Sequence, residues 1–251
     1  MIFDAEQFEM DGWTVLLGAL PRHIVEDLRA AIVAHRSSFS PSEEVLYPHT
    51  SPPPGKPGMD ALMEQWFNAY RRAGTLATTT AVEETRRIAA QILGAPAVLF
   101  QDVLMVKHAR HREFPWHQDF PYWPVDNPLG VIVWAPLDPT DAGNGGLVVA
   151  SGSHQAGPGP AIDLHNGERQ VGYNEDIPAP LASTQLALMP GDLALFHPLT
   201  WHRSGVNSSS HPRRAWSASW LHPSARWAPD RAPRHPLSAG LLGGSPVSEQ
   251  S

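Results

Sequence analysis

The sequence contains no cysteine. This absence excludes disulfide frameworks, thiolate zinc sites, iron–sulfur clusters and cysteine nucleophiles, and it leaves histidine and carboxylate side chains as the ligands for any metal. Basic residues are also scarce, because 18 Lys and Arg stand against 25 Asp and Glu and give a formal charge of −7. Since no basic run is longer than a pair, we expect neither a nucleic-acid partner nor an anionic membrane partner.

Long apolar runs are missing as well. No run approaches the ~18 residues that a membrane span requires. The first residues, Met1–Gln7, are acidic and lack the apolar core of an export signal. We therefore expect a cytoplasmic protein that acts on a small-molecule substrate. The sequence does not predict an oligomeric state.

The length of 251 residues is ample for a buried core. We expect a single domain over residues 1–228. Residues 229–251 are rich in Pro, Arg, Gly and Ser and have no apolar period, so we expect them to form a mobile C-terminal tail.

The N-terminal part is expected to combine one short strand with helices. Gly12–Leu17 is predicted to be a strand, and the stretch from Pro21 to about His35 carries apolar residues at helical spacing. Further helices are predicted at about Met59–Ala73 and Val82–Leu93, and these helices should brace one face of a sheet. The Pro- and Gly-rich stretch Ser37–Gly58 is predicted to be a loop that acts as a lid.

From Ala97 onward the pattern changes to short β-type runs bounded by Pro, Gly, Asn and Asp. The predicted strands are Val98–Val106, Gly130–Leu137, Gly146–Ala150, Gln185–Met189, Leu193–His197 and Ala215–Leu221. Such strands favour a mainly β fold with bracing helices, either a sandwich or a barrel. The version that holds a metal between its sheets is the double-stranded β-helix, the jelly roll also seen in cupins. The aperiodic segment Gly152–Ala182 is predicted to be an insertion over the mouth of the site.

A candidate metal site begins in the stretch Trp116–Pro124, which offers an imidazole and a carboxylate. On an extended strand, His117 and Asp119 would point to one face. A third ligand comes from a later segment in which both His197 and His202 are candidates. Two histidines and one carboxylate with open positions on the metal are typical of non-haem Fe(II) oxygenases.

Eight short motifs follow one another in a distinctive order. They are Phe8–Trp13, Gln101–Lys107, Trp116–Asp119, Trp134–Asp138, Gly143–Leu147, Ser151–His154, Pro190–Asp192 and His202–Asn207. In this order the sequence resembles the phytanoyl-CoA dioxygenase-like family of Fe(II)- and 2-oxoglutarate-dependent oxygenases. The resemblance implies the jelly-roll fold, Fe(II) as the metal, and 2-oxoglutarate and O2 as cosubstrates.

The resemblance also implies roles for individual residues. His117, Asp119 and His202 would be the iron ligands, with His202 preferred to His197 because the following motif then falls at the family's spacing. Arg213 would pair with the distal carboxylate of 2-oxoglutarate. The further cosubstrate contacts would be Ser204, Gln101 and Trp134.

The chemistry of the cosubstrate agrees with these roles. 2-Oxoglutarate is a dianion whose distal carboxylate needs a fixed cation, and a guanidinium offers two parallel charge-assisted hydrogen bonds. Arg214 is adjacent to Arg213, and on a strand only one of them can face inward; Arg213 is chosen on spacing alone. Lys107 remains open between a surface residue and a neighbour of the cosubstrate.

Four aromatic residues next to the ligands are candidates for substrate walls, namely Trp116, Phe120, Tyr122 and Trp123. They suggest a compact, partly apolar substrate such as a secondary-metabolite intermediate. Few basic residues are present to hold the phosphates of CoA, so the family name is not taken to give the substrate.

One residue narrows the set of reactions that the site is expected to catalyse. In the halogenating relatives a small residue takes the place of Asp119, so the carboxylate favours hydroxylation over halogenation. Desaturation, epoxidation and ring closure stay open. The alternative from another class is a non-catalytic jelly-roll protein that binds a small molecule or senses a metal.

Overall fold

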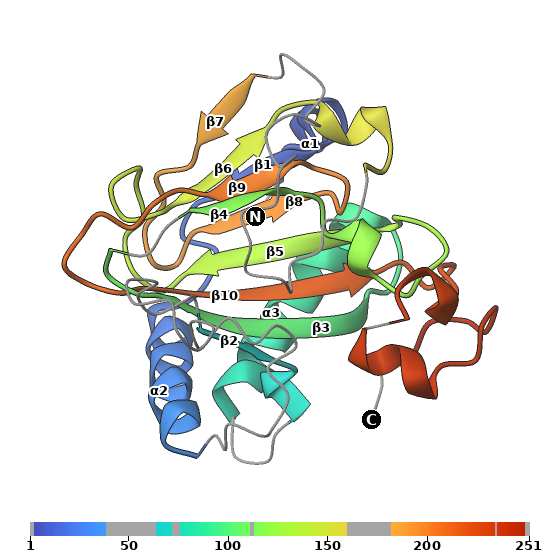
Figure 1. Ribbon diagram of the computed structural model, residues 1–251, viewed down its shortest axis with the longest axis horizontal. Helices are drawn as coiled ribbons and strands as arrows, with labels where there is room; N and C mark the ends of the chain where they lie inside the picture. Colours follow the sequence, from blue (N-terminus) through green and yellow to red (C-terminus); the bar gives the residue numbers. More distant parts are fainter. Residues whose placement is uncertain are drawn as a thin grey trace, which may run out of the picture.

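The computed structural model describes residues 3–38, 64–71, 76–110, 113–159, 182–233 and 235–248. Its strands form two antiparallel sheets (Figure 1). The larger sheet has the order β1 (Trp13–Leu16), β8 (Leu193–Phe196), β5 (Gly130–Pro136), β10 (Arg213–Leu221), β3 (Val98–Lys107) and β2 (Glu64–Phe67). The smaller sheet has the order β4 (Phe114–His117), β9 (His202–Ser204), β6 (Leu147–Ala150) and β7 (Ser183–Gln185). This architecture confirms the predicted jelly roll.

The two faces of the larger sheet are covered differently. Alternate residues of β10 point to opposite faces, so Trp216 and Trp220 lie in the core on the helix side. Ala215 lies in a second core between the two sheets. Ser217 and Ser219 line a cavity between the sheets. The strand therefore carries one apolar face and one face that is partly polar.

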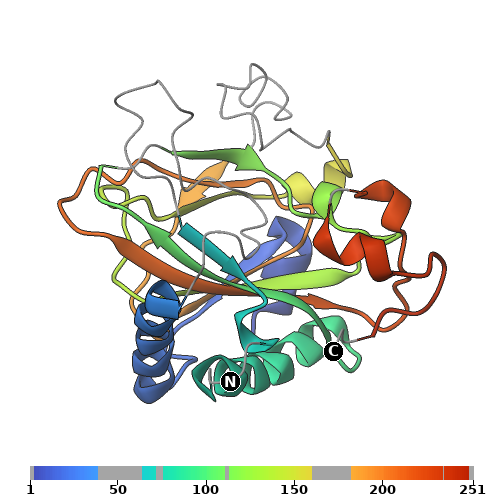
Figure 2. The ribbon, with the colours of Figure 1, turned by 60° about the horizontal axis from the view of Figure 1, so that its bottom comes forward.

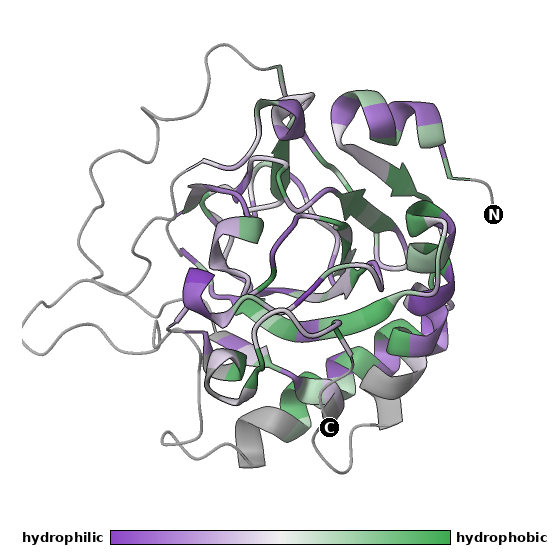
Figure 3. Cartoon of the chain, turned by 90° about the vertical axis from the view of Figure 1, so that its right-hand side faces the viewer, coloured by the Kyte–Doolittle hydropathy of each residue, from purple (hydrophilic) through white to green (hydrophobic). Residues whose placement is uncertain are grey.

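Two long helices, α2 (Arg22–Ser38) and α3 (Leu76–Leu93), lie beneath the larger sheet (Figure 2). The predicted helical spacing of α2 is confirmed, because Ile24, Leu28 and Ile32 are all buried in the core on that side. Figure 3 shows hydrophobic stretches both on the larger sheet and on the helices next to it.

The short N-terminal helix α1 (Ala5–Asp11) has defined ends. The Asp4 side chain accepts a hydrogen bond from the backbone N–H of Gln7, which satisfies one of the free N–H groups at the helix start. Gly12 ends the helix at a φ of 76°, a left-handed conformation that favours glycine. Three-residue to five-residue 3-10 turns connect other elements: η1 (Ala69–Arg71), η2 (Phe120–Tyr122), η3 (Ser153–Ala156), η4 (Pro229–Arg231) and η5 (Pro236–Gly240).

The helix predicted at about Met59–Ala73 is wrong over the residues that the structure describes. Residues 64–67 form β2, which pairs with the edge of β3 and places Trp66 opposite Leu104. Trp66 is buried on the helix side, whereas Gln65 and Phe67 line the cavity on the other side. Alternate side chains therefore point to opposite faces, as on a strand. Pairing with β3 outweighs the helical spacing of apolar residues in this segment.

The predicted strand Gln185–Met189 is displaced toward the N-terminus. β7 spans Ser183–Gln185 and pairs with β6. Beyond it, Leu188 makes only an isolated bridge with Thr140, because the chain there leaves the small sheet. The predicted lid Ser37–Gly58 falls outside the described residues except where α2 ends, and most of the predicted insertion Gly152–Ala182 falls outside them too.

The C-terminal segment does not agree with the expectation of a mobile tail. Val247 is buried in the core between the sheets, and Leu237 and Leu241 pack against the same core. The backbone N–H of Val247 donates to the carbonyl of Ala225 at 3.1 Å. Figure 1 shows this segment, in red, folded against the ends of β3 and β10. The described part of residues 229–248 therefore packs with the rest of the domain. Its apolar side chains have no regular period, but they are buried against the core between the sheets.

None of the helices in the described residues is long and apolar enough to cross a membrane.

Candidate metal centre

Three side chains from two segments of the chain meet between the sheets. His117, Asp119 and His202 each offer one ligand atom, and these atoms all lie within 4.8 Å of one another. Nε2 of His117 is 3.5 Å from Oδ1 of Asp119, and Nε2 of His202 is 3.7 Å from the same oxygen. Two imidazole nitrogens and a carboxylate oxygen converging in this way fit a divalent ion such as Fe(II).

Strand pairing brings the two histidines together. His117 is the last residue of β4 and is paired with His202, the first residue of β9. Their rings lie 4.0 Å apart between centroids. Neighbouring strands place directly opposed side chains within contact distance, so the pairing of β4 with β9 accounts for the meeting of these two side chains.

Asp119 reaches the same point by a different route from the one predicted. The sequence suggested that Asp119 continues an extended strand, but β4 ends at His117 and Asp119 has helical dihedral angles at the start of η2. Its backbone N–H donates to the carbonyl of Pro198, which anchors the turn. The side chain of Gln118, between the two ligands, points away from them and donates to the carbonyl of Leu199 at 2.7 Å.

The protonation of the triad suits metal binding. Nδ1 of His202 lies 3.0 Å from the carbonyl of Thr200; a carbonyl can only accept, so Nδ1 carries the proton and Nε2 presents its lone pair. Burial and then the neighbouring His117 lower the pKa of His202 to about 4. Burial alone would raise the pKa of Asp119, but His202 and a hydrogen bond from His117 hold it below its usual value. A neutral imidazole and an ionised carboxylate are the forms that bind metals.

A buried arginine lies in the same cavity. Arg213 is the first residue of β10 and is only 2% exposed. Among the described residues, its Nε and Nη1 atoms have no hydrogen-bond partner. Burial lowers its pKa to about 10, so the guanidinium remains charged at neutral pH. A buried charge without an anion is unfavourable, and this site therefore calls for an anionic ligand.

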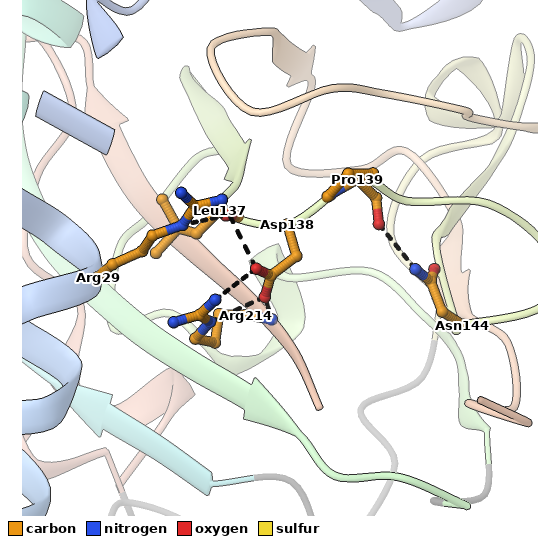
Figure 4. A network of polar contacts seen from close by, with 6 residues as sticks. All are labelled: Arg29, Leu137, Asp138, Pro139, Asn144 and Arg214. Atoms are coloured by element: carbon orange, nitrogen blue, oxygen red, sulfur yellow. Dashed lines mark hydrogen bonds and ion pairs between the residues drawn. The ribbon is translucent and has the colours of Figure 1, made fainter. Parts of the chain in front are cut away.

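Arg214 is turned to the other side of the sheet. Its Nη2 lies 2.6 Å from Oδ1 of Asp138, and its Nε lies 2.9 Å from Oδ2. Arg29 of α2 lies 3.6 Å from the same carboxylate. Figure 4 shows both arginines gathered around Asp138. Of the two adjacent arginines, only Arg213 lines the cavity.

Lys107 lies beside Arg213 and was left open by the sequence. It is fully buried, and it is paired with Arg213 across β3 and β10. Its Nζ donates to Oγ of Ser204 at 2.9 Å and to the carbonyl of Ser204 at 3.1 Å. Because that hydroxyl oxygen already accepts a hydrogen bond, its own O–H is available to donate to an anion next to Arg213. Burial, followed by the charge of Arg213, lowers the pKa of Lys107 to about 6.

The cavity between the sheets has a volume of about 140 Å³. The three residues of the triad line it together with the four predicted cosubstrate contacts, Arg213, Ser204, Gln101 and Trp134. Two of the predicted substrate walls, Tyr122 and Trp123, line it as well.

The other two predicted substrate walls lie elsewhere. The Trp116 ring faces the guanidinium of Arg203 at 5.4 Å. Phe120 is buried in the core between the sheets, with the guanidinium of Arg231 at 4.4 Å from its ring. Neither Trp116 nor Phe120 is among the described residues that line the cavity.

The position of Lys107 was left open although the sequence carried a signal for it, and His235 was missed. Lys107 follows Gln101, Val103 and Met105 at a spacing of two on β3, so it could have been assigned to their face. His235 lines the cavity from the C-terminal segment. No periodicity marks that segment, and the sequence alone carried no signal for His235.

Solved structures share this fold. An epimerase from nogalamycin biosynthesis, described in complex with Fe3+, alpha ketoglutarate and nogalamycin RO, superposes with a TM-score of 0.76 at 21% identity, over 98% of this chain and 94% of that one. At this identity the likeness establishes the architecture alone.

Sequence relatives cover about half of the chain. The 1-deoxypentalenic acid 11-beta-hydroxylase of Streptomyces exfoliatus is 30% identical over 140 residues, 51% of this chain and 49% of the relative. The peroxisomal phytanoyl-CoA dioxygenase of Bos taurus is 37% identical over 117 residues, 44% of this chain and 33% of the relative. The matched segments span half or less of these relatives.

The family model "Phytanoyl-CoA dioxygenase (PhyH)" matches residues 8–215. That range includes the triad, Arg213 and Lys107, and it covers most of the chain. The chain therefore belongs to the phytanoyl-CoA dioxygenase family.

Proposed function

We propose that this protein is an Fe(II)- and 2-oxoglutarate-dependent oxygenase that oxidises a C–H bond of a small organic molecule, in the first place by hydroxylation, with release of succinate and CO2. One observation carries the proposal: the triad of His117, Asp119 and His202 shares its cavity with Arg213, a buried cation whose Nε and Nη1 have no partner among the described residues. A metal site beside a site for a small anion is what this chemistry requires.

Each residue is given a defined task. His117, Asp119 and His202 would hold the iron, which when bound supplies the activation of O2 coupled to oxidative decarboxylation of 2-oxoglutarate. Arg213 would bind the distal carboxylate of the cosubstrate through two charge-assisted hydrogen bonds. Ser204 would donate a hydrogen bond from its hydroxyl group to the same carboxylate.

The aromatic and aliphatic walls shape the reaction space. Trp134 lies under the Arg213 guanidinium, with the charge 5.5 Å from the ring centroid. Ile132, Phe196 and Leu147 line the cavity, and the Phe196 ring lies 4.7 Å from that of His202. These side chains would exclude water from the metal, which strengthens the electrostatic interactions in the site and limits side reactions.

Asp119 favours hydroxylation over halogenation, because its carboxylate fills the position that a halide would need on the metal. Desaturation, epoxidation and ring closure would use the same residues. Analysis of the product mass separates these outcomes into two groups, since hydroxylation and epoxidation add one oxygen atom whereas desaturation and ring closure remove two hydrogen atoms.

A small-molecule substrate and a cytoplasmic location are part of this proposal. The relatives are named for different substrates, 1-deoxypentalenic acid, phytanoyl-CoA and L-proline, so family membership supports a small molecule without selecting one. The formal charge of −7 supports a substrate other than a nucleic acid. The family match favours the enzyme over the non-catalytic alternative.

The proposal is tested by measuring succinate formed from 2-oxoglutarate in air with added Fe(II), in the presence of pools of small organic molecules. Asp119→Ala should abolish substrate-dependent succinate formation while the protein stays folded. Asp230, an exposed aspartate, provides the matched control, and Asp230→Ala should keep the wild-type rate. Wild-type turnover in Asp119→Ala would refute the assignment.

A further inference from the structure

A neutral polar pair lies in the cavity away from the charged residues. Nε2 of His235, from the C-terminal segment, lies 3.4 Å from Oε1 of Gln101 on β3. Both side chains line the cavity. The pair connects the segment that follows β10 with β3 inside the cavity of the proposed active site.

A bulge in β3 places Phe100 on the same inward side as its neighbour Gln101. The register of β3 with β10 shifts at this point: Ser219 is paired with Gln101, but Trp220 is paired with Leu99, so one residue of β3 is left over. That residue is Phe100, which lies in the core between the sheets, whereas Leu99 lies in the core on the helix side. A bulge places two successive side chains near the same face, and this one therefore directs both Phe100 and Gln101 inward.

The surroundings of His235 fix the direction of its hydrogen bonds. The ring is stacked on Phe100, with centroids 5.2 Å apart. The backbone N–H of Leu237 donates to Nδ1 at 3.2 Å, so Nδ1 carries a lone pair and Nε2 carries the proton. Burial lowers the pKa of His235 to about 4, which keeps the ring neutral at physiological pH.

The orientation of the Gln101 amide follows from that proton. Because Nε2 of His235 donates, the atom of Gln101 that faces it must be the oxygen. The NH2 group of Gln101 is then the end that remains for the cavity. An amide NH2 group is a donor only, and it binds carbonyl, hydroxyl or ether oxygens.

No charge remains for the substrate at this end among the described lining residues. The charged ones are Asp119, Arg203 and Arg213. Arg203 lies 3.0 Å from the carboxylate of Glu113, Asp119 is assigned to the iron, and Arg213 is assigned to the cosubstrate. The uncharged lining residues include the hydroxyl residues Ser217 and Ser219, of which Ser219 is paired with Gln101, and the apolar or aromatic Val103, Ile132, Tyr122 and Trp123.

We propose that Gln101, held in orientation by His235, donates a hydrogen bond to an uncharged oxygen of the substrate, so that the enzyme takes an uncharged, oxygen-bearing and otherwise apolar molecule. This inference rests on the proposed function and names its substrate class. It also gives Gln101 a different task from the cosubstrate contact that the family resemblance implied. Gln101 is paired with Ser219, six residues along β10 from Arg213, which is roughly 20 Å on an extended strand.

The test is a binding panel for the protein loaded with Fe(II) and 2-oxoglutarate without O2. The probes are matched sets of compounds that share one carbon skeleton and carry a ketone, a hydroxyl, a carboxylate, an ammonium or no polar group, and bound probe is measured by equilibrium dialysis with mass spectrometry. The ketone or alcohol should bind about tenfold more tightly than the hydrocarbon, the gain from one hydrogen bond, and more tightly than either charged compound.

Variants separate the donor from the residue that positions it. Gln101→Leu keeps the volume and removes the NH2 group, so ketone and hydrocarbon should bind equally while the affinity for 2-oxoglutarate is unchanged. His235→Phe keeps the ring on Phe100 but loses the Nε2 proton, so ketone binding should fall severalfold. His235→Gln returns a neutral donor at this position and should restore part of the preference.

The matched control is a partly exposed histidine with the same local hydrogen bond. Nδ1 of His222 accepts from the backbone N–H of Ser224, as Nδ1 of His235 accepts from Leu237. His222→Phe should leave the panel unchanged, so that an effect confined to His235→Phe arises in the cavity.

Three results would overturn the inference. They are tightest binding by the carboxylates or the ammonium compounds, no uncharged oxygenated binder at millimolar concentration, and a Gln101→Leu variant that loses 2-oxoglutarate affinity but keeps its preference for ketones. Binding is read without turnover. If Fe(II) and 2-oxoglutarate themselves fail to bind, the proposed function is wrong. The same panel of probes, measured on the apoprotein, still tests whether Gln101 binds an uncharged oxygen.

Discussion

The two ends of the cavity are built on the same pair of strands and offer opposite chemistry. At one end of β10, Arg213 is paired with Lys107, and two buried basic side chains lie side by side. At the other end, Ser219 is paired with Gln101, and the groups there are neutral. A basic end suits a fixed dianionic cosubstrate, whereas a neutral end suits a substrate held by shape and a hydrogen bond. Changes at one end should therefore leave binding at the other end intact.

The largest expected effect is at the charged end. Arg213→Ala removes the partner of the distal carboxylate and should weaken 2-oxoglutarate binding by about 3 kcal/mol, roughly a hundredfold. Arg214→Ala is the matched control, because that side chain pairs with Asp138 outside the cavity. Titration of 2-oxoglutarate into the anaerobic Fe(II) protein measures both. If Arg214→Ala weakens the cosubstrate more than Arg213→Ala, the assignment of the inward arginine is wrong.

Lys107 should make the stability of the cosubstrate-free protein depend on pH. Its pKa in the folded protein, about 6, lies below the ordinary value of 10.5, so between these values the unfolded chain binds a proton that the folded protein does not. Stability should therefore rise with pH from about 6 toward 10.5, by at most ~1.4 kcal/mol per pH unit. Urea unfolding at a series of pH values measures the slope.

Lys107→Met removes this titration and should flatten the slope over the same pH range. Saturating 2-oxoglutarate should also reduce it in the wild-type protein, since a neighbouring anion favours the charged amine. An equal slope in the wild-type protein and Lys107→Met would contradict a neutral buried lysine.

Gly145 holds the loop that packs on Lys107. Its φ is +77°, and a Cβ there would lie 2.6 Å from the carbonyl oxygen of Gly205 and 2.9 Å from Cδ of Lys107. Gly145→Ala should lower the free energy of unfolding by about 2 kcal/mol. Gly244 has a similar φ of +79° with no atom within 4 Å of its Cβ position, so Gly244→Ala should cost less. Equal losses would show that the backbone conformation alone matters.

The smallest effect concerns Trp134, whose ring lies 5.5 Å from the guanidinium of Arg213. Trp134→Leu should weaken 2-oxoglutarate binding by about 1 kcal/mol, close to fivefold, through loss of the cation–π contact. Trp134→Phe keeps an aromatic face, so its affinity for 2-oxoglutarate should lie between those of the wild-type protein and Trp134→Leu. A loss as large as that of Arg213→Ala would mean that Trp134 acts by shaping the cavity rather than by supporting the charge.

Local patterns predicted the elements that are strongly periodic. The buried face of α2 and most strands follow the sequence pattern, and three ligand candidates from distant segments converge as expected. The turn at Asp119 could not be read from spacing, because it depends on a hydrogen bond to Pro198 from another part of the chain. The predictions for residues 64–67 and for the C-terminal segment were wrong for a related reason. The pairing of β2 with β3 and the burial of Val247 depend on surfaces that exist only in the folded protein.

The side chains of the site show the same division. Arg213 could be proposed from its spacing after His202, and Lys107 shares the two-residue period of its strand. Gln101 lies on the same period as Lys107, whereas His235 comes from a segment without periodicity. The residues expected for the family, Gln101 included, are therefore visible in the sequence, whereas the position of His235 depends on packing in the folded protein.

The most direct test of the central claim is an anaerobic titration of the apoprotein with Fe(II) and 2-oxoglutarate, followed by the weak visible charge-transfer band between the metal and the oxoacid. We predict the band in the wild-type protein and none in His202→Ala, because the variant lacks the third ligand. No band in the wild-type protein, or an undiminished band in His202→Ala, would contradict the assignment of this cavity as an iron and 2-oxoglutarate site.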